Sequence, residues 1–581
     1  MIDKRPLIYY CIAFLFGCYS ALFMLNNNFF GAALAASFLA CIFITQKSKL
    51  SYVAAVFLIL GYVNYYLYYS LVPPEKFPVR IDKVQSYYST GSYLGRKFVV
   101  KGNVQGVAEG EKLYINGSYT FNPQYDKGII GDIEIKSISG RKKDFISKLY
   151  TFKRKLYEKY EANMGEKPAA EVMAACFGDD SYMGQDTMQE MSSLGIVHVI
   201  SVSGLHMALI YKVCEMFLGF GWGIALSIVY CLFTGAAPPT VRSLIMIIVL
   251  KLSKRVYKNY DPLSSLSLAG IIVVAVRPAN AMDGGTILSF LAMLGIFLHY
   301  EKIRKALYRL PEKLNESISL TFSAQVYSLP ICISMFNSAS TAMLQGNILI
   351  VPIYSLLLIL GNISLPFINI DFLFKFFCFF LKVAYEAIEG GRYILDKISS
   401  KPIFLSSIDG WVLIIIYVSY ILYKRRDRRF VWLPLFSVIF YVLCSFSPVP
   451  EFKYVNIGYN NAIIYRNGFK SVLFTDMGKY KGGEMLLRKK FNVEAIRNVG
   501  SKEDFTYRDK SLSFVVKHNK NGVLLNYLNG KAEANMCFCD ETIPVSGGQL
   551  CDIIYLPYKK TGYYYDELLC IVIVNGKPIK L

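Results

Sequence analysis

Two histidines and two serines stand close together in one apolar stretch of this 581-residue chain. The stretch covers residues 195–206 and reads Gly-Ile-Val-His-Val-Ile-Ser-Val-Ser-Gly-Leu-His, with its polar and flexible positions at His198, Ser201, Ser203, Gly204 and His206. Polar groups in hydrocarbon are costly unless they find partners or water, so the cluster indicates the lining of a wet path. If the stretch is helical, His198 shares a face with Ser201, and Ser203 shares one with His206. Interhelical hydrogen bonding that only holds helices together is the alternative.

The same residue types also occur in enzymes that form a covalent intermediate with their substrate. Ser203 would be the nucleophile of a membrane-embedded hydrolase and His206 its base. Such sites usually take the base from a second element, and the sequence offers no evident oxyanion donor. The hydrolase is therefore the weakest of the functional interpretations.

The composition is that of a membrane protein that crosses the bilayer many times. Hydrophobic residues make up 54% of the chain and aromatic residues 15%, with a mean hydropathy of +0.36. The net charge is +21. Part of this excess is expected on cytoplasmic loops, and only the remainder can serve an anionic partner.

Residues 1–72 predict three N-terminal transmembrane helices. The first run follows Arg5, and two more apolar runs cover residues 29–45 and 52–72. Basic residues lie before the first helix and between the second and third, at Lys4, Arg5, Lys47 and Lys49. This places the N-terminus in the cytoplasm and sends the chain outside after Val72.

Two further segments follow outside the membrane. Residues 73–145 consist of short alternating segments, with a hairpin signal at Asn116-Gly117, and predict a small β barrel of the OB type. Such barrels often bind single strands, but a structural cap is an equal interpretation here. Residues 146–194 are amphipathic and basic and predict helices at the outer membrane surface.

Residues 195–448 predict a transmembrane channel core. Ten apolar runs begin near positions 196, 223, 241, 262, 287, 317, 342, 366, 410 and 431, which gives about thirteen crossings with the first three. Basic clusters at 251–258, 302–313 and 424–429 then fall on cytoplasmic turns. The expected fold is a polytopic α-helical membrane protein with an extracytoplasmic OB-like β domain and a C-terminal extracytoplasmic α/β domain.

The sequence of the polar stretch resembles the His-x-x-x-x-Ser-Gly-Leu-His signature of the ComEC family, the inner-membrane channels of DNA uptake. Other elements follow in the family's order between about 168 and 365. Gly178-Asp179-Asp180-Ser181 resembles its Gly-Asp-x-Ser element. Asp283 to Ala292, with Ser289, looks like its Gly-Phe-Gln-Leu-Ser-Phe-Leu-Ala element, although Thr286 and Ile287 replace the aromatic residue and the glutamine. Gln325 also falls where a similar residue occurs.

A proline pair completes this resemblance. Pro238, Pro239 and Arg242 are similar to the family's Gly-x-x-Pro-Ser-x-x-Arg turn, with Pro239 in place of the usual small residue. Two prolines in apolar sequence break a helix, and irregular backbone at membrane depth is tolerated only against protein or water. Arg242 is the residue we expect to contact phosphate, because its guanidinium stays charged and forms paired hydrogen bonds. A carbonyl-capping or ion-pairing arginine is the alternative.

Residues 449–581 resemble a shortened metallo-β-lactamase-like domain. Two strands joined at Asn467-Gly468 lead to Asp476-Met477-Gly478, as the opening of that domain does. The zinc-binding His-x-His-x-Asp-His run that should follow is missing, and the only later histidine is His518. We therefore predict no hydrolase activity, no metal and no cofactor.

Four cysteines fall in this C-terminal part, namely Cys537, Cys539, Cys551 and Cys570. Their spacing is a poor match to a zinc site. The outward location is oxidising, so disulfide bonds are the favoured interpretation.

The resemblance implies a channel that moves single-stranded DNA into the cytoplasm during natural transformation. The residues expected along the path are His198, Ser201, Ser203, Gly204, His206, Pro238, Pro239, Arg242, Asp283, Ser289 and Gln325. Besides DNA and the lipid bilayer, the expected partners are a DNA receptor, a separate nuclease and a cytoplasmic ATP-driven motor, because the chain has no Walker lysine loop. A small-solute transporter with broken helices is the alternative, although no inverted repeat is visible.

Overall fold

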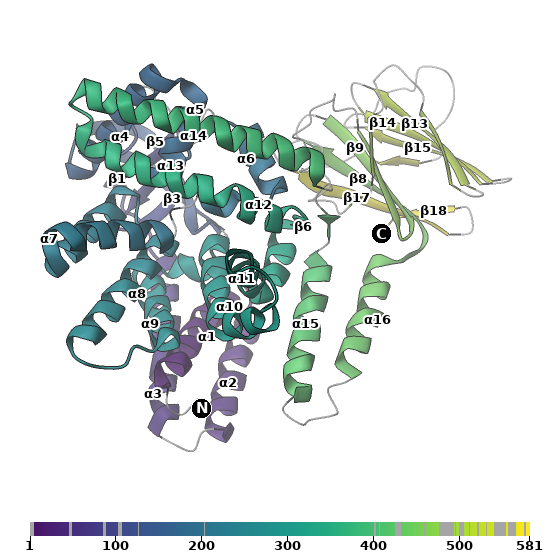
Figure 1. Cartoon of the computed structure of the whole chain (residues 1–581). Coiled ribbons are helices and arrows are strands. Elements are labelled where there is room, and N and C mark those ends of the chain that lie inside the picture. Colours follow the sequence, from purple (N-terminus) through teal and green to yellow (C-terminus); the bar gives the residue numbers. More distant parts are fainter. Residues whose placement is uncertain are drawn as a thin grey trace. The chain divides into compact units, whose positions relative to one another are not determined.

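The chain forms two compact units in the computed structural model (Figure 1). One contains Met1–Ser328 and Thr341–Ser400, and the other contains Leu329–Ser340 and Lys401–Leu581. The structure describes residues 5–45, 49–84, 89–102, 107–125, 127–200, 202, 204–399, 403–405, 407–424, 432–457, 460–475, 493, 495–498, 505–509, 512–519, 522–529, 532–539, 553–555, 565–574 and 577–580.

The three predicted N-terminal helices are present in the first unit. They are α1 (Pro6–Asn26), α2 (Asn28–Thr45) and α3 (Lys49–Tyr69). Glycine brings α1 and α3 into backbone contact, since a Cβ on Gly61 would lie 2.1 Å from the Phe14 carbonyl oxygen. At the start of α1, Arg5 forms a 2.9 Å ion pair with Asp261. The N-terminal end of α1 and the turn before Pro262 therefore lie together.

The predicted barrel follows directly. Its strands are β1 (Lys76–Val84), β2 (Ser89–Tyr93), β3 (Arg96–Lys101), β4 (Lys112–Gln124) and β5 (Ile129–Lys142). They close in the order β1-β2-β3-β5-β4, with β3 and β5 parallel.

One local prediction in the barrel is wrong. Asn116-Gly117 does not form a hairpin turn but lies inside β4, where the pairing with β5 shifts register. A Cβ on Gly117 would lie 2.5 Å from the Glu134 carbonyl oxygen. Glycine therefore serves the close approach of two strands at a bulge rather than a turn.

A layer of helices follows the barrel. Figure 1 shows its members running crosswise to α1 and α3 within the first unit: α4 (Phe145–Met164), α5 (Glu166–Phe177), α13 (Val351–Ser364) and α14 (Asp371–Ile398). They enclose a buried core that includes Phe177, Leu357 and Phe374. We call these four helices the upper layer.

The remaining helices of the first unit are α6 (Gln185–Ser193), α7 (Gly204–Phe233), α8 (Pro238–Arg255), α9 (Pro262–Val276), α10 (Gly284–Ala306), α11 (Glu312–Phe336, whose end belongs to the second unit) and α12 (Met343–Leu349). By length and composition alone, five helices among the described residues could cross a membrane, or six if the bent pair of α12 and α13 is one span. One of the five is α7, which is interrupted at Gly219. Three shorter apolar helices add to these. The expected count of about thirteen is not confirmed, although a multi-pass membrane protein is.

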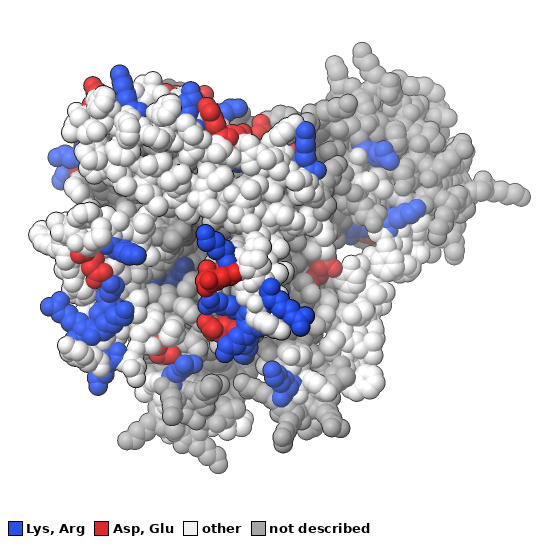
Figure 2. Space-filling model, viewed as in Figure 1, with Lys and Arg blue, Asp and Glu red and all other residues white. Residues whose placement is uncertain are grey.

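The charges on the surface are segregated. Figure 2 shows lysines and arginines gathered over the end of α8, and a group of both signs over the ends of α10 and α11. Charges of both signs lie along the upper layer. The surface between them carries few charges, as a lipid-facing surface requires.

The second unit is strand-rich, as predicted for the C-terminal part. After α15 (Ser407–Lys424) and α16 (Leu433–Ser445), a six-stranded sheet has the order β11-β10-β9-β8-β17-β18 and a five-stranded sheet the order β12 to β16. The strands are β8 (Ser447–Ile457), β9 (Asn460–Gly468), β10 (Lys470–Thr475), β11 (Ala495–Asn498), β12 (Phe505–Asp509), β13 (Leu512–Asn519), β14 (Gly522–Asn529), β15 (Ala532–Cys539), β16 (Ile553–Tyr555), β17 (Tyr565–Val574) and β18 (Lys577–Lys580). A short ladder joins β6 (Ser338–Ala339) to β7 (Ile403–Phe404).

The predicted turn at Asn467-Gly468 does connect β9 to β10, and Gly468 has the positive φ of 62° that such a turn needs. Cys537 and Cys539 lie on β15 and Cys570 on β17. Cys551 and Asp476-Met477-Gly478 lie outside the described residues.

Candidate functional site

The first part of the polar signature, residues 195–200, is not α-helical, whereas its last part, 204–206, begins α7. After α6 ends at Ser193, Gly195 takes a positive φ of 72°, a short 3-10 turn covers Val197–Val199, and α7 begins at Gly204. The predicted continuous helix from 195 onward is therefore wrong, because a left-handed glycine ends the preceding helix. His198 lies on the turn and is exposed. Ser201 and Ser203 lie outside the described residues.

Helix α7 folds back on itself. Its chain breaks at Gly219, with φ of 82° and ψ of 176°. A Cβ on Gly223 would lie 3.3 Å from the Cα of Glu215, although residues eight apart in a straight helix are separated by about 12 Å. The two legs, 204–218 and 220–233, are each about 21 to 23 Å long, which is short of a bilayer core of about 30 Å. The two spans predicted from 196 and 223 are therefore the legs of one hairpin.

Both legs of this hairpin bind the end of α5. The Nε2 atom of His206 donates to the carbonyl oxygen of Ala175 at 2.9 Å, and the hydroxyl of Tyr230 donates to that of Cys176 at 2.6 Å. The last carbonyls of a helix have no partner within it, so these bonds satisfy them. His206 is buried. Its described contact with α5 is structural.

The helix break at the proline pair, between α7 and α8, meets the break before α7 in the signature loop; we call these the two breaks. Pro238 and Pro239 begin α8, where the missing N–H groups are not needed. The hydroxyl of Thr240 donates to the carbonyl oxygen of Val202 at 3.1 Å. A Cβ on Gly204 would lie 3.1 Å from the Ser243 hydroxyl oxygen and 4.0 Å from Nη2 of Arg242. The fold thus joins two motifs that are some forty residues apart in the sequence.

Arg242 is buried at this junction, with 6% of the residue exposed. Its Nη1 donates to the carbonyl oxygen of Ser289 at 3.0 Å, and its guanidinium lies 5.9 Å from the ring centroid of Phe290. Its Nε has no hydrogen-bond partner, and none of the ion pairs among the described residues includes Arg242. A carbonyl contact is thus present, but no carboxylate in the described part of the chain forms an ion pair with Arg242. The adjacent N-terminus of α7 adds partial positive charge.

The other predicted path residues have separate roles. Asp283 caps α10, accepting from the amide of Thr286 at 2.8 Å and from its hydroxyl at 2.7 Å. Ser289 contributes its backbone carbonyl to Arg242. Gln325 contacts the sulfur of Met343 at the start of α12. Only Ser289 among these three bonds with Arg242 in the contacts described.

Sequence reasoning missed the opposite wall of the loop. A Cβ on Gly346 of α12 would lie 2.7 Å from the side chain of Ile196 and 3.4 Å from the carbonyl oxygen of Leu194. The loop therefore lies between α8 and α12. A glycine directly before Asn347 was the available signal, because only glycine permits such an approach.

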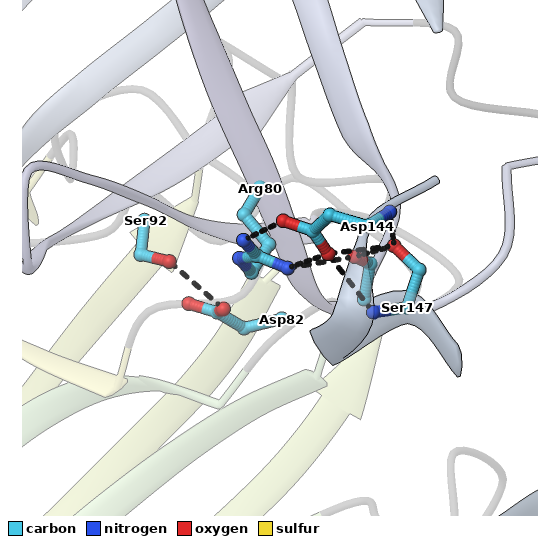
Figure 3. Close-up of polar contacts among 6 residues, drawn as sticks. Arg80, Asp82, Ser92, Asp144 and Ser147 are labelled. Atoms are coloured by element: carbon cyan, nitrogen blue, oxygen red, sulfur yellow. Dashed lines mark hydrogen bonds and ion pairs between the residues drawn. The ribbon is translucent and has the colours of Figure 1, made fainter. Parts of the chain in front are cut away.

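The barrel is fixed to α4 by one ion pair, drawn in Figure 3. Arg80 of β1 donates to both carboxylate oxygens of Asp144, at 2.9 and 2.5 Å. Asp144 also accepts from the amide of Ser147 and so caps α4. The Arg80 guanidinium holds the pKa of the Asp144 carboxyl well below its usual range. Nearby, Asp82 accepts from the hydroxyl of Ser92 at 2.9 Å, and burial raises the pKa of its carboxyl.

A second contact leads from the barrel toward the loop. Lys83 of β1 pairs with Asp180 at 3.0 Å, within the Gly-Asp-Asp-Ser element. A Cβ on Gly178, in the same element, would lie 3.1 Å from the Val202 side chain. The element thus connects the barrel to the junction of the two breaks. No cluster of three or more metal-binding side chains occurs in the part of the chain that the structure describes.

Part of the chain is similar to a known family of proteins. Residues 175–448 match the family model described as Competence protein. The chain is 24% identical over 202 residues to ComE operon protein 3 of Bacillus subtilis, which covers 33% of this chain and 26% of that protein. It is 20% identical over 212 residues to Recombination protein 2 of Haemophilus influenzae, covering 32% and 27%. An uncharacterised protein of Mycoplasma genitalium is 26% identical over 189 residues, covering 31% and 48%.

The chain thus spans less than half the length of each of these relatives. No solved structure matches it significantly.

Proposed function

Because residues 175–448 make this chain a member of the ComEC family of competence proteins, we propose that it passes single-stranded DNA across the inner membrane into the cytoplasm. A role in DNA uptake follows from the family. The finer assignment, a conduit for one strand, rests on the junction of the two broken helices.

The observation that carries the proposal is that Arg242 is buried and that none of the described carboxylates pairs with it. A buried guanidinium without a carboxylate is unfavourable, and at membrane depth an ionisable group of this kind generally serves a ligand or a pathway. Here it lies beside the N-terminus of α7, whose amides also favour an anion. A DNA backbone supplies one phosphate per nucleotide, and contacts with phosphate carry no sequence preference. Uptake of any sequence needs this type of contact.

Contacts within the first unit support the orientation of the chain. Arg5 pairs with Asp261 at one end of the helices, where the basic ends of α8 and α10 also belong. At the other end, Tyr19 donates to the Ala281 carbonyl, and Arg96 of the barrel donates to the Tyr68 carbonyl at the end of α3. By the positive-inside rule the barrel then faces outward and receives the incoming strand.

The two soluble domains take supporting parts in this proposal. The barrel's strand order and single parallel pair support the OB assignment, and the barrel either guides the strand or caps the helices. The C-terminal sheets are assigned to a metallo-β-lactamase-like domain without hydrolase activity. Strand degradation and driving force would then come from a separate nuclease and a cytoplasmic ATP-driven motor, with a DNA receptor outside.

The hydrolase alternative, with Ser203 as nucleophile and His206 as base, is not the function we propose. Such sites usually take the base from a second element and need an oxyanion donor, and the sequence shows no evident oxyanion donor. The Nε2 of His206 donates to the carbonyl of Ala175, and the side chain is buried against α5.

Complementation tests the proposal. The complete chain is expressed in a transformable host that lacks its own relative, and entry of labelled DNA into a nuclease-protected cytosolic pool is measured. We expect the wild-type chain to restore DNA entry. At equal protein level, we expect the Arg242→Gln variant to restore only a small fraction of it. Arg255→Gln, an exposed change at the opposite end of α8, is the matched control. Equal entry with Arg242→Gln and wild type would remove the phosphate assignment.

A further inference from the structure

A largely buried ionic cluster lies in the upper layer, and Arg242 is not part of it. The side chain of Arg392 on α14 is 1% exposed and that of its partner Glu171 on α5 is 2% exposed. The Arg392 guanidinium donates to the Glu171 carboxylate and, at 2.5 Å, to the hydroxyl of Tyr354 on α13. The Tyr354 hydroxyl also donates to Glu171. Three helices of the upper layer thus meet at one set of directional bonds.

Stability alone is a weak explanation for such a cluster. Removing two charges from water costs several kcal/mol for each ion, and apolar residues of similar volume often serve equally well. Hydrogen bonds to a planar guanidinium do fix the angles between its partners. The cluster therefore specifies how the three helices are placed more than how firmly they are held.

The cluster reaches the first end of the signature loop through α6. The sulfur of Met191 lies 3.8 Å from Nη2 of Arg392 and 3.9 Å from the Tyr354 hydroxyl. The carbonyl oxygen of Met191 accepts from the amide of Ile196 at 3.0 Å. One residue thus touches the cluster with its side chain and the loop with its backbone.

The other end of the loop is reached through α5. Glu171 lies one turn before Ala175, whose carbonyl oxygen accepts from His206 at the start of α7. A third connection runs through α14 and α12. Leu395, one turn after Arg392, faces Gly346, the residue packed against Ile196.

We propose that Glu171, Tyr354 and Arg392 are positioning residues that set the conformation of the loop between α6 and α7. They act through Met191, Ala175 and Gly346 and do not contact the strand. This inference rests on the proposed function for its transport readout, but not for its structural readout.

The test removes both charges together. Arg392→Met alone would leave the Glu171 carboxylate buried without a partner and is expected to fold poorly. Glu171→Gln combined with Arg392→Met keeps the volumes and leaves no buried charge unpaired, because Glu389, the second carboxylate that pairs with Arg392, is 46% exposed. The matched control is Arg5→Gln with Asp261→Asn, an ion pair in the same unit that has no described contact with the loop.

Three quantities are compared at equal protein level: the thermal stability of the full chain in detergent, DNA entry into cells, and the reaction rate of a cysteine introduced at the exposed His198 with a membrane-impermeant maleimide. The labelling rate is corrected for the same background without that cysteine. We expect the double variant to fold, its labelling rate at position 198 to change, and DNA entry to fall by at least about tenfold. The control pair is expected to leave labelling and entry unchanged.

The outcomes separate the two ideas. Parental labelling and parental entry in a folded double variant would overturn the positioning role. Reduced entry with unchanged labelling would also overturn it, because the cluster would then act without the loop. If labelling changes but the wild-type chain admits no DNA, the positioning role stands and the conduit fails.

Discussion

The hydroxyl of Thr240 donates a 3.1 Å hydrogen bond to the carbonyl oxygen of Val202. This bond joins the first turn of α8 to the loop that precedes α7, and both residues are buried. The bond therefore holds the start of α8 and the loop before α7 together. Arg242 lies half a turn beyond Thr240 on α8. Disturbing it should affect both breaks together.

We expect Thr240→Val to lower stability by about 1 kcal/mol, because the Val202 carbonyl loses its partner while the volume is kept. DNA entry should fall more than this loss of stability explains. Thr240→Ser retains the hydroxyl and is the control. Thermal unfolding in detergent and DNA entry are measured for both. Equal behaviour of the Val and Ser variants would show that the bond does not matter.

The charge of Arg242 should be visible in salt dependence. If the guanidinium contacts one phosphate, Arg242→Gln should reduce the slope of log affinity for single-stranded DNA against log salt concentration by up to about 1. Arg242→Lys should keep most of the slope but weaken binding, since an ammonium lacks the planar fork. Binding of a labelled oligonucleotide between low and physiological salt provides the measurement. An unchanged slope in the Gln variant would return Arg242 to a carbonyl-capping role.

Because of the Arg80–Asp144 pair, we expect the stability of the protein to depend on pH. Arg80 depresses the pKa of Asp144, so the pair stabilises the junction of the barrel and α4 above the ordinary aspartate pKa of about 3.9. That contribution is lost as pH falls from there toward the folded-state pKa. Asp144→Asn keeps the helix cap and removes only the charge.

We therefore expect Asp144→Asn to unfold below the wild-type temperature at pH 7, with the difference shrinking below about pH 4. Arg80→Gln should show the same trend, since it removes the same pair. Thermal unfolding in detergent across this pH range is the measurement. A difference that stays constant down to pH 3 would mean that the charge is not responsible.

Where two helices are in close backbone contact, we expect stability to be sensitive to the substitution of glycine by alanine. A Cβ on Gly295 of α10 would lie 2.2 Å from the carbonyl oxygen of Ser323 on α11. Gly295→Ala should therefore cost about 1–3 kcal/mol, because backbone must move. Gly390→Ala on α14 has no atom within 4 Å of the new Cβ and should be neutral or slightly stabilising. Similar unfolding temperatures for both variants would contradict the tight α10 and α11 packing.

Much of the fold was predictable because it depends on local patterns. Three apolar runs gave α1, α2 and α3, and period-two alternation between 73 and 145 gave the barrel whose strands cover 76–142. Hydropathy does not show, however, whether an apolar helix crosses the membrane or runs in another direction. The apolar runs near 342 and 366 became a pair of helices bent by 47° and the amphipathic α14, whose apolar residues occupy more than one face. Length and apolarity alone do not separate such helices from spans.

The site was predicted in part for the same reason. The proline pair marked a true break, and the fold brought it to Gly204. Whether DNA passes these residues stays a prediction. The helix across the signature failed because Gly195, one residue in an apolar run, takes a left-handed conformation. Glu171 and Arg392 are 221 residues apart, so no local pattern predicts their pairing. A glutamate within the apolar, buried stretch Pro168–Phe177 of α5 was the available signal.

The central claim is that a DNA strand passes the junction of the two breaks. The most direct test places a photoreactive amino acid at His198, which is exposed on the loop, and arrests a strand in passage with a bulky group on its trailing end. Val229, an exposed apolar position on the return leg of α7, carries the same amino acid as the control. We expect irradiation to crosslink the arrested strand to position 198 and not to position 229. Crosslinking at neither position, in variants that still admit DNA, would contradict the account.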